Sequence, residues 1–170
     1  MGLFGPSKIK ITPNDFVKNQ LDKIFSANFI DAEKKSYGSL SKEISILQIV
    51  SIDKYLKERQ NVIYNLFQLA WDRNTPHDIF IEYCSIMLDD PRVKAINSGV
   101  YDMCLSKAQE AGMDTFGYIS TVFITQIIPR EVDVNDNDYS KIYITFGSDF
   151  TSLYKYFEGL IKKHKFIVPA

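Results

Sequence analysis

Residues 41–73 constrain the fold more than any other part of the chain, because they contain neither glycine nor proline. Both residues are disfavoured inside helices, so their absence permits a helix of up to ~50 Å. Any break is expected in the polar residues 57–61. Residues 62–71 are apolar on nearly every face and are expected to form the central buried helix. Spacings of three and four define a heptad seam with one polar member, made of Ile49, Ile52, Leu56, Arg59, Ile63, Leu66 and Ala70.

Three residue pairs carry the signal for the start of a helix. Each joins a residue that caps helix N-termini to a proline, which fits the first helical position. The pairs Thr12-Pro13, Thr75-Pro76 and Asp90-Pro91 predict helices over residues 14–29, 79–88 and 91–111. Gly38 is expected to stop helical structure after the first of these, and Gly112 to end the last. A further helix is expected over residues 149–163.

The β-like segments are short and lie mostly near the two ends of the chain. Residues 131–134 and 141–146 flank an Asn/Asp-rich turn and predict a hairpin over 131–146. Residues 8–11 and 166–168 could join it in a small sheet. Residues 119–128 fit either a strand or an all-round buried helix. The predicted fold is mainly α: a multi-helix bundle with this minor β component, and an α+β fold is the alternative.

Length and composition indicate one globular domain over residues 1–170, with 45% hydrophobic and 24% charged residues. The net charge of −1 argues against a nucleic-acid partner. The uncharged run 115–129 would span only ~22 Å as a helix, too short for the ~30 Å core of a membrane, so no membrane partner is expected. Cys84 and Cys104 are too few for a disulfide framework. We expect them to be buried thiols of a cytoplasmic protein.

Charge is distributed unevenly along the chain. The net charge is +3 over residues 1–60, −7 over residues 61–138 and +3 over residues 139–170. Asp133, Asp136 and Asp138 fall in the predicted turn and are expected to be an exposed acidic surface for a basic partner protein. The competing explanation is that the lysine-rich segments fold against the acidic centre and neutralise it.

His77 and Asp78 lie at a predicted helix start, and Glu82 lies one turn beyond Asp78 on the same face. The doublet resembles the His-Asp pair of the HD family of metal-dependent phosphohydrolases. That resemblance implies a metal held by both side chains, by an earlier histidine and by a later aspartate. No histidine precedes His77, and the second histidine is His164, so the ligand set is incomplete. Paired carboxylates can also perform acid–base chemistry without a metal.

The aspartate-rich turn partly matches a calcium-binding loop of the EF-hand type. Asp133, Asn135 and Asn137 occupy its first, third and fifth positions. Asp138 stands where the loop needs glycine, and Ile144 stands where it needs a bidentate glutamate. We therefore predict no metal and no cofactor.

The leading hypothesis is a non-catalytic cytoplasmic protein-interaction or regulatory module that binds through its acidic segment. One alternative is a small metal- or acid/base-dependent enzyme that uses His77, Asp78 and Glu82. Another is a self-assembling structural component, motivated by the seam in residues 41–73. The expected partner is thus an unidentified protein or a second copy of the chain.

Overall fold

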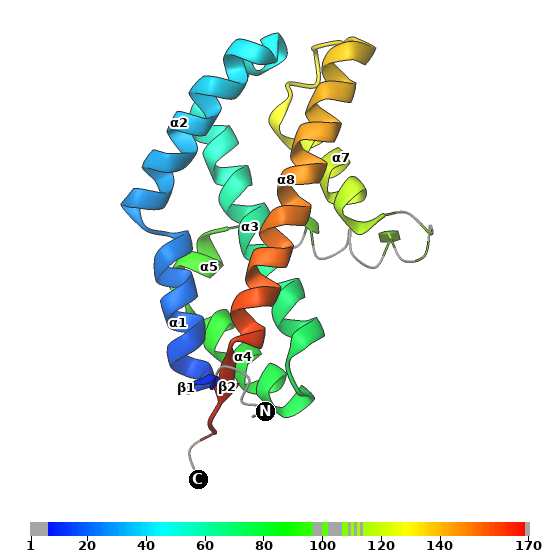
Figure 1. Ribbon diagram of the computed structural model, residues 1–170. Coiled ribbons are helices and arrows are strands. Elements are labelled where there is room, and N and C mark those ends of the chain that lie inside the picture. Colours follow the sequence, from blue (N-terminus) through cyan, green and yellow to red (C-terminus); the bar gives the residue numbers. More distant parts are fainter. Residues whose placement is uncertain are drawn as a thin grey trace, which may run out of the picture.

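The computed structural model describes residues 7–96 and 114–168, together with residues 100, 101, 107, 108, 110 and 112 (Figure 1). Helices account for 79% of these residues, which confirms a mainly helical single domain with a small sheet. The elements are β1 (Ile9–Ile11), α1 (Pro13–Ile24), α2 (Ala27–Glu43), the 3-10 helix η1 (Ser45–Ile49), α3 (Ile52–Asn74), α4 (His77–Asp89), α5 (Pro91–Ala95), α7 (Thr115–Ile127), α8 (Asp136–Lys162) and β2 (His164–Phe166).

Helix α3 is the centre of the bundle and packs against α8, α7, α2, α1 and α4. The predicted core helix is confirmed, because Leu66, Phe67, Ala70 and Trp71 are each 0% exposed. The Trp71 ring stacks on Phe16 of α1 at a centroid distance of 5.1 Å. Aromatic contacts of this kind add to the apolar area that is removed from water.

The break in residues 41–73 lies at 44–51 rather than at the predicted 57–61. The chain leaves α2 at Ile44, which is 2% exposed, and the hydroxyl of Tyr37 donates hydrogen bonds to the carbonyls of Leu47 and Val50 at 2.6 and 2.7 Å. Helix α2 continues through Gly38, so the expected stop at this residue is wrong. A glycine inside an exposed helix costs only ~1 kcal/mol, which packing elsewhere can offset.

The predicted hairpin over residues 131–146 is wrong, because residues 136–162 form the single helix α8. Asn135 caps this helix, and Ile142, Phe146 and Phe150 are buried at spacings of four. The isoleucines and aromatic residues of this segment therefore follow a helical period, although their types favour strands. Residues 119–127 are likewise helical, in α7, with buried residues on several faces.

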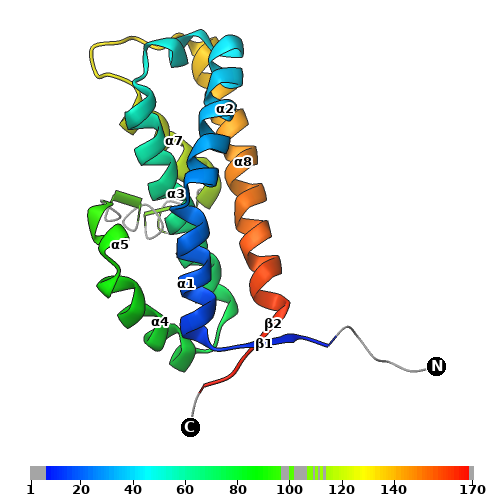
Figure 2. The same cartoon turned by 90° about the vertical axis from the view of Figure 1, so that its left-hand side faces the viewer.

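The two chain ends pair as predicted, but without the hairpin. Strands β1 and β2 run parallel, with Ile9 opposite His164, Lys10 opposite Lys165 and Ile11 opposite Phe166. Figure 2 shows the two strands together at one end of the molecule, below the helices. Within the predicted helix over 91–111, residues 91–95 and the described residues 100, 101, 107, 108 and 110 are helical, but Ile96 is extended and ends α5, so the prediction of one continuous helix is wrong.

The expectation of buried cysteines is untested. Cys104 and the side chain of Cys84 lie outside what the structure describes. In the described part of the chain, no helix combines the length and the hydrophobicity needed to cross a membrane.

Candidate functional site

An apolar groove lies where α7, the following loop and the start of α8 meet. It has a volume of about 250 Å³. Helix α7 and its C-cap supply Ile124, Thr125 and Ile128, and α8 supplies Tyr139; the loop supplies Pro129, Val132, Val134 and one cation, Arg130. A second depression of about 220 Å³ lies on the other side of Tyr139, beside Tyr143 and Ile144. Tyr139 is 38% exposed and Ile144 is 68% exposed, so apolar surface extends from the groove along α8.

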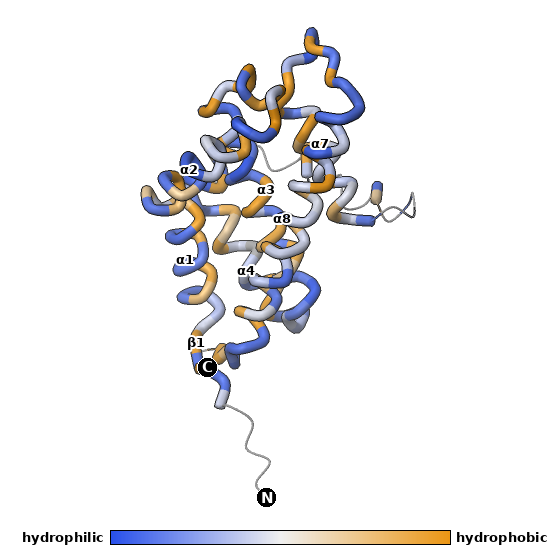
Figure 3. Tube along the Cα trace, turned by 45° about the horizontal axis from the view of Figure 1, so that its top comes forward, coloured by the Kyte–Doolittle hydropathy of each residue, from blue (hydrophilic) through white to orange (hydrophobic). Residues whose placement is uncertain are grey.

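The loop that forms one wall of the groove alternates between apolar and acidic residues. Val132 and Val134 are half-buried, whereas Glu131 and Asp133 are exposed. Figure 3 shows this alternation along the segment that joins α7 to α8. The predicted strand was wrong. The alternation with a period of two is nevertheless present in this loop, which has one apolar and one charged side. We call this groove with Glu131, Asp133 and Asp136 the acidic groove.

Asp138 differs from the other two aspartates that the sequence singled out. It is 8% exposed, so its predicted exposure is wrong. Its backbone N–H donates to Oδ1 of Asn135 at 2.8 Å, and its Oδ2 accepts from Nδ2 of Asn135 at 3.1 Å. The hydroxyl of Ser45 donates to the same Oδ2 at 3.2 Å. The carboxylate of Asp138 therefore ties the N-cap Asn135 of α8 to Ser45 of η1.

The carboxylates of the acidic groove are not neutralised from within the described part of the chain. Its ion pairs join Arg59 to Glu33 and Asp149, Arg92 to Asp22 and Asp90, Lys94 to Asp89, and Lys162 to Glu158. None of them includes Glu131, Asp133 or Asp136. In the described part of the chain, the lysine-rich segments thus form no ion pair with these three groups, and the cation Arg130 lines the same groove.

The opposite end of the molecule is basic. Residues 7–11 and 162–168 contain five lysines and no acidic residue. Because Lys10 and Lys165 are opposite each other in register, they lie side by side on one face of the two-stranded sheet. The other face carries Phe166, whose ring contacts Trp71 at 4.9 Å and Phe16 at 5.2 Å, so the lysine face is turned away from the core. We call residues 8–11 and 163–168 the basic ribbon.

A buried cluster of charges lies between α2, α3 and α8. Arg59 is 5% exposed, its Nε lies 2.8 Å from Oε2 of Glu33, and its Nη1 contacts Oδ2 of Asp149. Its guanidinium carbon lies 5.5 Å from the centroid of the Phe150 ring. Burial opposes the charged form of Arg59, but the two carboxylates outweigh it and raise the pKa of the guanidinium. Since every partner belongs to the fold, the cluster fixes the three helices relative to one another.

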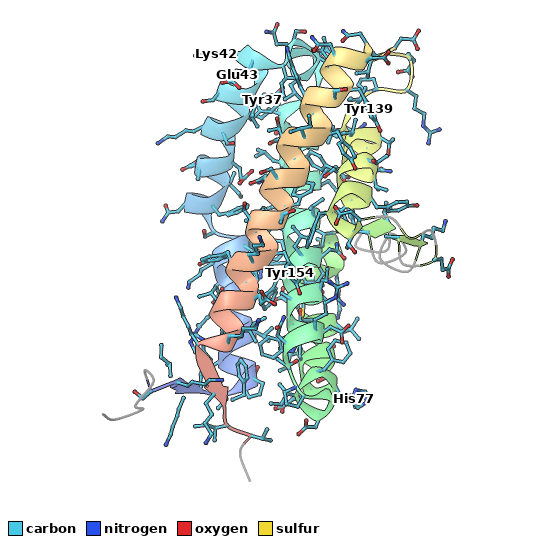
Figure 4. The ribbon with its side chains drawn as sticks, turned by 45° about the vertical axis from the view of Figure 1, so that its right-hand side comes forward. Tyr37, Lys42, Glu43, His77, Tyr139 and Tyr154 are labelled. Carbon is cyan, nitrogen blue, oxygen red and sulfur yellow. The ribbon has the colours of Figure 1, made fainter. Side chains whose placement is uncertain are left out.

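The residues of the enzyme hypothesis do not converge. His77 and Asp78 are exposed at the first turn of α4, and Glu82 is half-buried one turn later. Figure 4 shows His77 near the end of the molecule away from Tyr139. None of the three lines any of five well-formed cavities in the described part of the chain. This geometry gives the enzyme hypothesis no support.

The described part of the chain also gathers no set of metal-binding side chains. Among the described residues, no cluster of three or more His, Cys, Asp and Glu side chains could hold a metal ion. The prediction that the protein holds no metal remains a prediction.

A larger cavity, of about 490 Å³, lies between α7 and α8. Two of its four hydroxyl groups bond within α8, since Thr151 donates to the carbonyl of Gly147 at 2.8 Å and Ser152 to that of Ser148 at 3.0 Å. Lys155 supplies positive charge to this cavity and Asp114 negative charge. The hydroxyls of Thr151 and Ser152 are thus committed to the helix, and the opposite charges favour no single class of ligand.

Sequence reasoning identified the acidic residues of the groove but missed its apolar part. The alternation of residues 131–134 was visible and was assigned to a strand. Tyr139 and Ile144 gave no signal, because their exposure depends on how α8 packs. Lys10 and Lys165 could not be paired, because the register of two chain ends is set by the helices between them.

The comparisons with known proteins gave no match for this chain, whether against family models, curated proteins or solved structures.

Proposed function

We propose that the protein is a non-catalytic protein-interaction module whose acidic groove binds a basic segment with aliphatic side chains. One observation carries the proposal: an open apolar groove bordered by a loop in which half-buried valines alternate with exposed carboxylates, the cation Arg130 being the one charged residue among the described residues of the lining itself. An extended segment in which Lys or Arg alternates with aliphatic residues would match both properties. Its aliphatic side chains would enter the groove, and its cations would face Glu131, Asp133 and Asp136.

The apolar groove and the carboxylates would contribute differently to binding. Burial of aliphatic side chains contributes ~25 cal/mol per Å² of apolar surface removed from water and sets most of the affinity. Exposed carboxylates at a rim mainly raise the association rate, and this effect falls with salt. A weak interaction with fast, salt-dependent association is therefore expected.

The test uses a fluorescein-labelled peptide in which arginine and leucine alternate, titrated with the full chain and followed by fluorescence anisotropy. Binding should weaken at least ~5-fold between about 50 and 200 mM salt. Asp133→Asn with Asp136→Asn should slow association, and Tyr139→Ser should mainly accelerate dissociation.

Asp31→Asn with Asp72→Asn is the matched control, because both aspartates are exposed and lie outside the groove. This control makes the same change in net charge. Absence of peptide binding, or an equal loss of binding in the control, would contradict the proposal.

A further inference from the structure

We propose that the natural occupant of the acidic groove is the basic ribbon of a second copy of this chain. The inference rests on the proposed function of the groove and names its partner. The two surfaces would join copies head to tail.

The two surfaces have complementary chemistry. The ribbon presents Lys8, Lys10 and Lys165 on one face, and the same segments carry exposed aliphatic residues: Ile9, on the opposite face of β1, is 59% exposed, Ile167 is 43% exposed and Val168 is 51% exposed. The acidic groove presents carboxylates beside an apolar depression. Each surface thus combines exposed charge with apolar area, and the charges are of opposite sign.

The ribbon also has features that favour a partner. Lys10 and Lys165 are paired across the strands, and like charges at opposed positions destabilise a sheet. The carboxylates of a second copy would remove this repulsion. A two-stranded sheet also leaves the outer edge of each strand without a neighbouring strand, and such an edge can pair with an extended segment. The loop at residues 132–135 belongs to no helix or strand and is the part of the groove that would meet this edge.

The chain cannot satisfy the two surfaces within one molecule. The groove lies at the N-terminal end of α8, and the ribbon includes the strand that follows its C-terminal end (Figure 1). Helix α8 has 27 residues, so it spans ~40 Å and holds the two surfaces apart. A groove on one copy can therefore take only the ribbon of another.

The symmetry of the contact follows. Because two different surfaces meet, the interface is heterologous and can extend from copy to copy. Its small size places it among weak and transient contacts. Association should thus rise with concentration, without a limit at the dimer, and should decrease with salt.

The experiment is sedimentation of the full chain at concentrations up to ~1 mM, the affinity range of weak contacts. The average mass should rise with concentration in about 50 mM salt and should fall towards that of one copy in about 500 mM salt. Asp133→Asn with Asp136→Asn, or Lys10→Gln with Lys165→Gln, should weaken association by at least about tenfold. Far-UV circular dichroism and the urea midpoint verify that both variants fold.

Mixing these two variants is the sharper measurement. The groove variant keeps an intact ribbon, and the ribbon variant keeps an intact groove. An equal mixture should form dimers of one copy of each and nothing larger, although neither variant associates alone. A contact that uses the same surface twice would not show this complementation.

The outcomes separate the two proposals. If the unmodified chain stays monomeric but its groove binds the arginine–leucine peptide, self-association is wrong and the proposed function stands. If the unmodified chain associates and the groove variant and the ribbon variant each associate as strongly as it does, another surface is responsible and this inference is wrong. If the peptide does not bind, the proposed function itself is wrong.

Discussion

Replacing Arg59 should show how far the buried charge cluster stabilises the bundle behind the acidic groove. Arg59→Met removes the guanidinium but keeps an unbranched apolar side chain of similar reach. The carboxylate of Glu33, whose side chain is 13% exposed, would lose its contacts to Nε and Nη2 of Arg59 at 2.8 and 3.3 Å. Asp149 is 40% exposed and can be hydrated in place of its ion pair.

The loss of stability in Arg59→Met is dominated by the carboxylate of Glu33, which stays buried without its partner. Breaking a buried pair by removing one partner costs ~3–5 kcal/mol, because the remaining charge is uncompensated. Loss of the guanidinium contact with Phe150 adds only ~0.5–1 kcal/mol. Removing the second charge as well, in Arg59→Met with Glu33→Leu, should return the stability to within about 1–2 kcal/mol of the original, since apolar replacement of a whole pair is often neutral.

Equilibrium unfolding in urea, followed by circular dichroism, measures these differences. With an m-value of ~2 kcal/mol/M, Arg59→Met should lower the midpoint by about 1.5 M or more. Lys162→Met is the control, because it removes an exposed pair with Glu158 on one face of α8 and should cost under ~0.5 kcal/mol. A loss as small as that of Lys162→Met would refute the reasoning. A double variant no more stable than Arg59→Met would refute it too.

Three further predictions concern stability. Asp138→Ala should lower the free energy of unfolding in urea by ~1–2 kcal/mol and leave the rate of peptide association unchanged. Asp133→Asn with Asp136→Asn should have the reverse effects. A slower association rate in Asp138→Ala would place Asp138 in the binding surface. Leu66→Ala should cost ~2–5 kcal/mol by the same assay, and a loss below ~1 kcal/mol would contradict its position in the core. Burial, only partly opposed by Arg59, raises the pKa of the Tyr55 hydroxyl above its usual value. An unfolded tyrosine ionises near pH ~10, so the contribution of Tyr55 to the free energy of unfolding should be fully present below that pH and be lost as the pH rises through the folded pKa. Tyr55→Phe should reduce this dependence of stability on pH. Tyr139→Phe, at an exposed site, should not.

Local patterns predicted helices where one physical signal dominated. The cap-plus-proline pairs at residues 12–13, 75–76 and 90–91 each mark a helix start within two residues of the observed one. The predicted position of the helix break was wrong. The polar residues 57–61 include Arg59, whose charge is paired with carboxylates on two other helices. No residue near 59 in the sequence reveals those partners, so polarity alone suggested a break that tertiary contacts prevent.

The hairpin error has a related cause. Residues 141–146 are rich in residues that favour strands, but that preference spans only ~1 kcal/mol and depends on context. Here the capping bonds of Asn135 and the burial of Ile142 and Phe146 against the bundle outweigh it. The sequence therefore located the acidic residues of the candidate site and misjudged the element that positions them. It could not separate exposed Asp133 and Asp136 from buried Asp138.

The position of the charges distinguishes a local helix effect from a contact between molecules. The dipole of α8 favours acids at its first turn and cations at its last, and this accounts for Asp136, Asp138 and Lys162 without any partner. The dipole acts only within the terminal turns, so it does not explain Asp133, which precedes the helix, or Lys10, which lies on β1. The ~40 Å length of α8 also exceeds the Debye length of ~8 Å at physiological salt, so the two ends do not stabilise each other within one copy. A net charge of −1 thus conceals two separated charged ends, and the proposed head-to-tail contact is one in which these two ends meet.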